Sequence, residues 1–165
     1  MDKDKILLGR RLLIVDDEQD ILDLLVELLS LCKIDAAGSF EKAKEFLGRY
    51  DYDIVILDVM GVKGFELLEI AKKKNIPALM LTAHALTEES LKKSAAQGAA
   101  YFVPKEEIQH IATFVADVLD ARDKRKNPWV RWFDRLSTTM DSIFTGANWR
   151  EREKEFWKKV RWGGE

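Results

Sequence analysis

Acidic, hydroxyl and basic side chains follow short apolar runs of this sequence, at the residue where each run stops. Asp16 and Asp17 come directly after one run, Asp58 after another, and Thr82 and Lys105 after the two that follow. Three converging carboxylates repel one another and raise one another's pKa values. A hard divalent cation such as Mg²⁺ removes that repulsion, because it prefers oxygen ligands. Together with a hydroxyl and an ammonium group, the set indicates phosphoryl chemistry.

Each group has a role in such chemistry. A metal ion and Lys105 would neutralise charge on the phosphoryl oxygens, and Thr82 would donate a hydrogen bond to one of them. Asp58 is then the nucleophile that forms an aspartyl phosphate. Taken alone, Asp16 and Asp17 could be a helix N-cap pair and Asp58 a loop aspartate. Neither alternative explains why Thr82 and Lys105 also end apolar runs, so the functional interpretation of the set is favoured.

The apolar runs have the length and pattern of strands. They lack alternation, which is typical of strands buried on both faces of a parallel sheet. The clear runs are residues 12–15, 54–57, 78–81 and 101–103, and a weaker one is 34–37. Helical periodicities lie between and after them, so a strand–helix unit repeats five times. Right-handed crossovers then place helices on both faces of one doubly wound sheet, whose site lies beyond the carboxyl ends of the strands.

The overall composition is that of an ordinary globular chain. Of 165 residues, 47% are apolar and 34% are charged, which excludes a disordered chain. No stretch approaches the roughly 18 apolar residues of a membrane span, and the charged N-terminus does not read as a secretion signal. The single cysteine, Cys32, excludes an internal disulfide framework and a multi-cysteine zinc site. We expect a cytoplasmic location.

Charge and tryptophan are unevenly distributed along the chain. Residues 121–165 hold 12 Lys and Arg against 7 Asp and Glu, a net charge of +5, whereas residues 1–120 hold 15 against 22, a net charge of −7. All five tryptophans also lie in the last 45 residues. We therefore predict a domain over residues 9–122, called the sheet domain below, and a basic, Trp-rich tail over residues 123–165.

Residues 9–122 resemble the receiver domain of a two-component response regulator. The resemblance rests on residues 12–18 (LLIVDDE), 55–58 (VILD), 81–83 (LTA) and 103–105 (VPK), in that order. It implies a (βα)5 flavodoxin-like fold. It also implies that a histidine kinase or a histidine phosphotransfer protein transfers a phosphoryl group to Asp58.

The resemblance further implies roles for individual residues. Asp17, Asp58 and the backbone carbonyl of Met60 would bind Mg²⁺ directly, and Asp16 would act largely through water. Thr82 and Phe102 would form a switch pair, in which the hydroxyl moves toward the phosphoryl group and the ring turns inward.

By family position, two residues that follow Thr82 lie at the rim of the site: Ala83 and His84. We hypothesise that His84, with the side chain of Met60, controls access of water and hence the lifetime of the acyl phosphate. The alternative is that His84 is an exposed loop histidine with no such role.

Two loops depart from the usual family pattern. After Asp58 the sequence lacks the common Met-Pro, and Gly61 and Gly64 favour a short path with positive φ angles. Pro104 precedes Lys105 instead of following it. A cis bond after Lys105 would cost about 3 kcal/mol without proline and is disfavoured.

The tail pattern predicts two amphipathic helices. The first would begin after an Asn127 cap, with Pro128 at its first position, and end at Gly146; the second would run from about 149 to 162. Four readings compete. The aromatic face could pack on the sheet domain or a second copy, could dock a partner protein, or could lie on a membrane surface, which its acidic residues disfavour. Nucleic-acid binding is disfavoured most, because two helices are too few for a typical DNA-binding output domain.

The sequence thus predicts a phosphorylation-dependent switch that acts through protein–protein interaction. We do not class it first as an enzyme, although receivers catalyse loss of their own acyl phosphate. The alternative is a scaffold or pseudo-receiver that is never phosphorylated, but such a protein would not need Thr82 and Lys105. A metal-dependent phosphohydrolase is disfavoured, because no further acidic residue follows the fourth strand.

Overall fold

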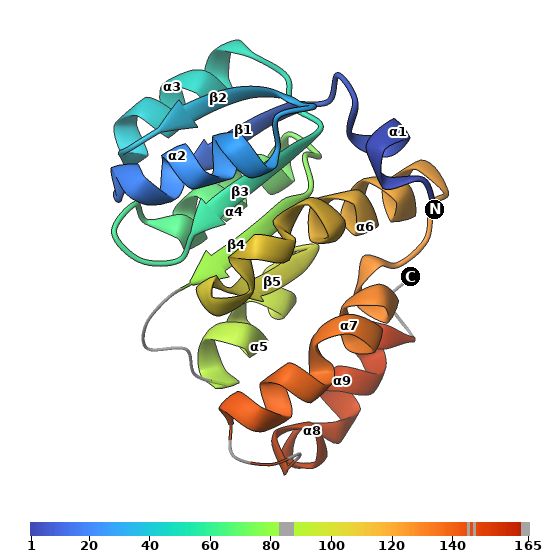
Figure 1. The fold of residues 1–165 in the computed structure, drawn as a ribbon. Coiled ribbons are helices and arrows are strands. Elements are labelled where there is room, and N and C mark those ends of the chain that lie inside the picture. Colours follow the sequence, from blue (N-terminus) through green and yellow to red (C-terminus); the bar gives the residue numbers. More distant parts are fainter. Residues whose placement is uncertain (83–87, 145, 147, 163–165) are drawn as a thin grey trace.

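Five parallel strands form one central sheet in the order β2-β1-β3-β4-β5 (Figure 1). The computed structural model of the chain describes residues 1–82, 88–144, 146 and 148–162. The strands are β1 (Arg11–Val15), β2 (Lys33–Ala37), β3 (Ile54–Asp58), β4 (Ala78–Thr82) and β5 (Tyr101–Pro104). Every residue of β3, β4 and β5 is buried, as their unbroken apolar runs predict. The flavodoxin-like order predicted from the sequence is confirmed.

Helices cover both faces of the sheet. They are α1 (Lys3–Leu7), α2 (Gln19–Leu28), α3 (Phe40–Arg49), α4 (Gly64–Lys73), α5 (Glu88–Ala96) and α6 (Ile111–Asp123), with a 3₁₀ helix η1 (Lys105–His110) after β5. Helices α2 and α6 contact each other, and so do α3 and α4. Right-handed crossovers in this strand order put α2 on the face opposite to α3, α4 and α5. The strands' carboxyl ends therefore stay open for a site.

Local residue choices explain where several helices begin and end. The hydroxyl of Ser39 caps α3 by accepting a hydrogen bond from the Lys42 amide at 3.2 Å. Gly98 follows α5 with φ +91°, the left-handed conformation that commonly ends a helix. The sequence pattern did not predict α1.

The tail forms α7 (Pro128–Ile143), α8 (Asn148–Arg152) and α9 (Lys154–Arg161). The Asn127 cap is confirmed, because its side chain accepts a hydrogen bond from the Trp129 amide at 2.9 Å. The single second helix predicted over 149–162 is wrong. Glu153, with φ −123° and ψ 41°, divides it into α8 and α9.

The tail packs on the sheet domain beside β5, α5 and α6 (Figure 1). Four of its tryptophans are buried in one aromatic cluster: Trp129, Trp132, Trp149 and Trp157. Trp162, by contrast, is 64% exposed. This arrangement agrees with the reading in which the aromatic face packs on the domain. Within the described residues, no helix combines the length and the apolar character needed to span a bilayer.

Candidate functional site

The structure brings the predicted charged and hydroxyl residues to one edge of the sheet. Asp58 and Thr82 are the last residues of β3 and β4, and Lys105 follows β5. Asp16 and Asp17 follow β1, whose Val15 pairs with Leu57 just before Asp58. Parallel register therefore sets all five positions at the carboxyl ends of neighbouring strands.

Three carboxylates form a compact cluster at this edge. One oxygen from each of Asp16, Asp17 and Asp58 lies within 4.8 Å of the others. Asp16 and Asp58 are buried and Asp17 is exposed, so the cluster opens to solvent on the Asp17 side. The main-chain amide of Glu18 donates a hydrogen bond to Asp16 Oδ1 at 2.9 Å, which fixes the orientation of that carboxylate.

Lys105 places a positive charge against the cluster. Its Nζ lies 2.8 Å from Asp16 Oδ2, 3.2 Å from Glu18 Oε2 and 3.5 Å from Asp58 Oδ1. Burial alone would lower the pKa of this ammonium, but the surrounding carboxylates outweigh burial and raise it. Lys105 is therefore a permanent cation beside Asp58.

Asp58 has the most perturbed carboxyl group of the site. Burial, and next the negative charge of Asp16, raise its pKa from 3.8 to about 6, against the opposing effect of Lys105. The fold thus concentrates negative charge that the protein alone only partly neutralises. This is the electrostatic setting in which a bound cation or a phosphoryl transition state with cationic ligands is stabilised.

The loop after β3 leaves room for this cluster. Gly61 adopts φ +83°, and a Cβ atom there would lie 2.6 Å from Asp17 Oδ2. A Cβ at Gly64 would lie 2.1 Å from the backbone oxygen of Asp58. The short path predicted from the two glycines is confirmed in part, because the second positive φ belongs to Lys63 at 55° and not to Gly64.

The donor set fits a divalent cation. Three carboxylates converge, and Gly61 keeps the space beside Asp17 free of a side chain. Hard cations such as Mg²⁺ take oxygen ligands of this kind. Met60, the fourth predicted ligand, lies two residues after Asp58 and its side chain is 59% exposed.

The remaining predicted residues have different placements. Phe102, predicted as half of the switch pair, is fully buried on β5. Thr82 is buried at the end of β4. Ala83 and His84, predicted at the rim, lie outside the described residues. The predicted absence of a cis bond after Lys105 is confirmed, since the described chain contains none.

Two residues of the site were not assigned a role from the sequence. Glu18 is a partner of Lys105, and its position directly after Asp16 and Asp17 could have indicated this. Gly61 lies against the Asp17 carboxylate, where a side chain would collide with it. Its spacing from Asp58 pointed only to a tight loop, because contact across to another strand end requires the folded structure.

Comparison with known proteins agrees with this geometry. The family model described as the response regulator receiver domain matches residues 12–116. The chain belongs to this family. Receiver domains typically bind Mg²⁺ at an acidic pocket, and the Asp16, Asp17 and Asp58 cluster occupies that place in this chain.

Receiver relatives occur in plants and bacteria. The chain is 37% identical over 118 residues to the two-component response regulator ARR18 of Arabidopsis thaliana, covering 66% of this chain and 18% of that protein. It is 35% identical over 95 residues to the uncharacterized transcriptional regulatory protein YrkP of Bacillus subtilis, covering 55% and 41%. The chain thus spans less than half the length of either relative.

Solved receiver structures share the fold. The CheY-like receiver domain protein of Methanospirillum hungatei superposes with a TM-score of 0.64 at 24% identity, over 71% of this chain and 98% of that one. The BeF3-activated DrrB receiver domain gives a TM-score of 0.62 at 24% identity, covering 68% and 99%. At these identities the likeness shows the fold.

Proposed function

We propose that this receiver accepts a phosphoryl group on Asp58 from a histidine kinase or a histidine phosphotransfer protein. The observation that carries the proposal is the convergence of Asp16, Asp17, Asp58 and Lys105, with Lys105 Nζ 3.5 Å from Asp58 Oδ1. A receiver used only as a scaffold has no need of a buried acidic cluster with a cation aimed at one carboxylate.

The residues divide the reaction among them. A carboxylate oxygen of Asp58 would attack phosphorus, while the bond from phosphorus to the donor's histidine nitrogen breaks and its electron pair stays on the imidazole. Lys105 would neutralise charge on the transferred oxygens, and Thr82 would donate a hydrogen bond to one of them. Mg²⁺, held by Asp16, Asp17, Asp58 and the Met60 carbonyl, would supply further positive charge for those oxygens.

The proposal includes the consequence of phosphorylation. Movement of the Thr82 hydroxyl, with Phe102 as its switch partner, would alter the surface around β5 and so change protein–protein interactions. The tail, residues 123–165, packs at this surface and would act as a unit distinct from residues 9–122. It would contact its own sheet domain, a second copy of the chain or another protein. We place these events in the cytoplasm, where a free thiol such as Cys32 persists.

The test combines intact mass with tryptophan fluorescence. The full chain is incubated with Mg²⁺ and acetyl phosphate, beside Asp58→Ala and a surface control, Asp51→Ala, whose side chain is fully exposed. We expect one added phosphoryl group in the wild type and the control variant, and none in Asp58→Ala. Residues 9–122 contain no tryptophan, so an accompanying change in emission reports on the tail. If no phosphoryl group is added to the wild type, the proposal of a phosphorylation-dependent switch is wrong and the scaffold alternative stands.

A further inference from the structure

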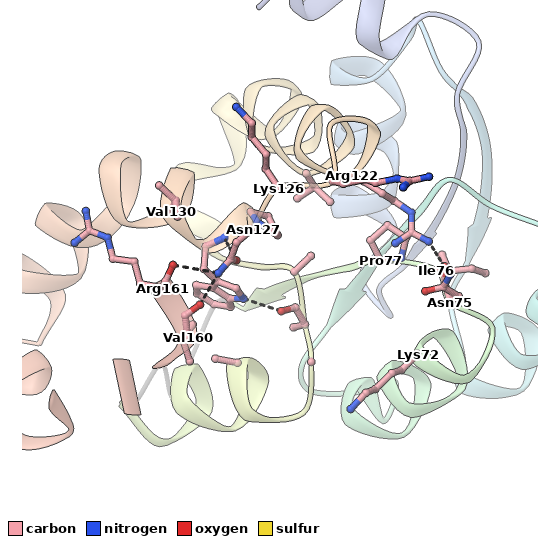
Figure 2. Close-up of a pocket in the computed structure, with 18 of the residues that line it drawn as sticks. Lys72, Asn75, Ile76, Pro77, Arg122, Lys126, Asn127, Val130, Val160 and Arg161 are labelled. Atoms are coloured by element: carbon pink, nitrogen blue, oxygen red, sulfur yellow. Dashed lines mark hydrogen bonds between the residues drawn. The ribbon is translucent and has the colours of Figure 1, made fainter. Parts of the chain in front are cut away.

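A cleft of about 1030 Å³ lies between the sheet domain and the tail, away from the acidic site. Its walls include residues 75–77, which precede β4, and residues 98–100, which precede β5. It is therefore at the amino ends of the strands, on the opposite edge of the sheet from Asp58. The α7 and α9 helices close it on the tail side (Figure 2).

The cleft is strongly basic. Five of its lining residues are basic, and none of its described lining residues is acidic: the basic ones are Lys72, Arg122, Arg125, Lys126 and Arg161. The charged ends of Lys126 and Arg161 point away from the cleft (Figure 2), and Arg161 also pairs with Asp134 at 3.8 Å, which leaves Lys72, Arg122 and Arg125 as the cations available to a ligand. Positive groups gathered around one concave surface create a potential that attracts anions. The positive charge of the cleft does not come from the basic tail alone. Lys72 and Arg122 belong to the sheet domain, whose net charge is negative.

Two of these cations are held at the cleft wall. Arg122 donates a hydrogen bond from Nη2 to the backbone oxygen of Asn75, which also lines the cleft (Figure 2). A guanidinium has five N–H donors, and this bond uses one of them. Lys72 lies across Gly98, where a Cβ atom would come within 3.3 Å of its Nζ. The missing side chain at Gly98 thus leaves space for the side chain of Lys72.

Apolar and aromatic residues of the tail also line the cleft. Val130 and Val160 line it opposite Lys72 and Arg122 (Figure 2). Trp162 is 64% exposed, and the guanidinium of Arg161 lies 4.6 Å from the centre of its ring. An exposed indole beside a cationic wall suits a ligand with a flat ring and several negative charges. A bare anion would fill little of a cleft at the upper end of the usual range for small-molecule sites.

We propose that this cleft binds a nucleotide with several phosphates. Lys72, Arg122 and Arg125 would hold the phosphates, and the base would lie against Trp162 and the apolar residues Val130 and Val160 of the tail. Because the walls come from both the sheet domain and the tail, the bound nucleotide would bridge the two. The proposal is independent of phosphorylation at Asp58.

Isothermal titration calorimetry with ATP tests the proposal. The full chain is used in EDTA, so that the acidic site takes no divalent cation. We expect saturable binding of ATP, and binding at least tenfold weaker for adenosine and for tripolyphosphate alone. Absence of saturable ATP binding overturns the proposal. Tripolyphosphate binding as tight as ATP overturns the nucleotide assignment, and tighter binding of a single-stranded oligonucleotide overturns it in favour of nucleic acid.

Variants locate the binding. We expect Lys72→Gln combined with Arg125→Gln to weaken ATP binding at least tenfold. Lys73→Gln combined with Lys158→Gln removes the same charge outside the cleft and should change it less than twofold. Equal effects of the two pairs would mean attraction to charge alone and would overturn the site. Trp162→Ala should weaken ATP binding at least threefold and leave tripolyphosphate binding unchanged; equal loss for both ligands overturns the role of the ring.

Discussion

The indole nitrogen of Trp132 donates a hydrogen bond to the backbone oxygen of Phe102 at 2.7 Å. Trp129 makes the same kind of bond to Ala99 at 2.9 Å. Because β5 is an edge strand of the described sheet, its outward carbonyls face no further strand, and Trp132 supplies a donor to the one at Phe102. Ala99 lies two residues before β5. Phe102 lies three residues before Lys105, so the tail is bonded to the strand that delivers the lysine of the acidic site.

The first prediction concerns this bond. Trp132→Phe keeps an aromatic ring but leaves the Phe102 carbonyl buried without its donor, so we expect the free energy of unfolding to fall by about 2 kcal/mol. Urea titration followed by circular dichroism measures it. Trp157→Phe is the matched control, because Trp157 belongs to the same cluster but its indole nitrogen donates no hydrogen bond among the described residues. Equal losses in the two variants would mean that ring volume, and not the bond, is responsible.

The relationship of Trp132 to Phe102 also shows where sequence reasoning stops. The positions of Asp58 and Lys105 could be predicted, because an apolar run places its last residue at a strand end and parallel strands align their ends. The amphipathic face of the tail could also be predicted. The surface that this face covers could not, because the hydrogen bonds between indole donors and edge-strand carbonyls depend on the folded arrangement.

The predicted bounds of the second tail helix were wrong for a similar reason. The apolar pattern of 149–162 continues through Glu153, yet the chain bends there and packs as two short helices. Packing of Trp149 and Trp157 around Trp132 thus overrides the helical periodicity. Local pattern fixes which residues are buried more reliably than it fixes the path between them.

The second prediction tests the loop that faces Asp17. Gly61→Ala places a methyl group on the Asp17 carboxylate, and we expect at least a tenfold loss of Mg²⁺ affinity, measured as the Mg²⁺ dependence of the melting temperature. In the wild type, Mg²⁺ at ten times its dissociation constant should stabilise the fold by about 1.4 kcal/mol, and EDTA should remove this gain.

The control for this variant is Gly9→Ala. Gly9 also has a positive φ, +77°, but a Cβ there meets no atom within 4 Å. Its substitution therefore introduces the same backbone strain without touching the acidic cluster. We expect both variants to lose stability and only Gly61→Ala to lose the response to Mg²⁺. A normal response in Gly61→Ala would refute the role assigned to the glycine.

The third prediction follows from the pKa of Asp58. This pKa is about 6 in the fold and 3.8 ordinarily, so between these values the folded chain holds a proton that the unfolded chain has lost. The stability contributed by this group must therefore decrease as pH rises from about 4 to about 6, and stay constant above that. Ionised Asp58 destabilises the fold at neutral pH.

Asp58→Asn should remove that penalty. In EDTA at pH 7, we expect the variant to unfold with a free energy higher by about 3 kcal/mol, since the rise of the Asp58 pKa from 3.8 to about 6 is worth about 1.4 kcal/mol per pKa unit. At pH 4 the difference should vanish. Asp51→Asn, at a fully exposed side chain, should change neither value by more than about 0.5 kcal/mol. A gain for Asp58→Asn that is equal at both pH values would contradict the assigned pKa.

The last prediction concerns the ion pairs that join the tail to α6. Arg135 contacts Asp117 through two nitrogens, and Asp117 is fully buried, with Tyr101 Oη donating to it at 2.8 Å. Removing one partner of a buried pair leaves an uncompensated charge, which commonly costs about 3–5 kcal/mol. Arg135 is partly exposed and Tyr101 keeps its bond, so we expect Arg135→Ala to cost about 2 kcal/mol.

Asp134→Ala removes the looser, exposed contact to Arg161 at 3.8 Å and should cost less than about 0.5 kcal/mol. Denaturant unfolding of both variants measures the difference, and a loss in Arg135→Ala no larger than in Asp134→Ala would mean that the tail is held by its tryptophans alone.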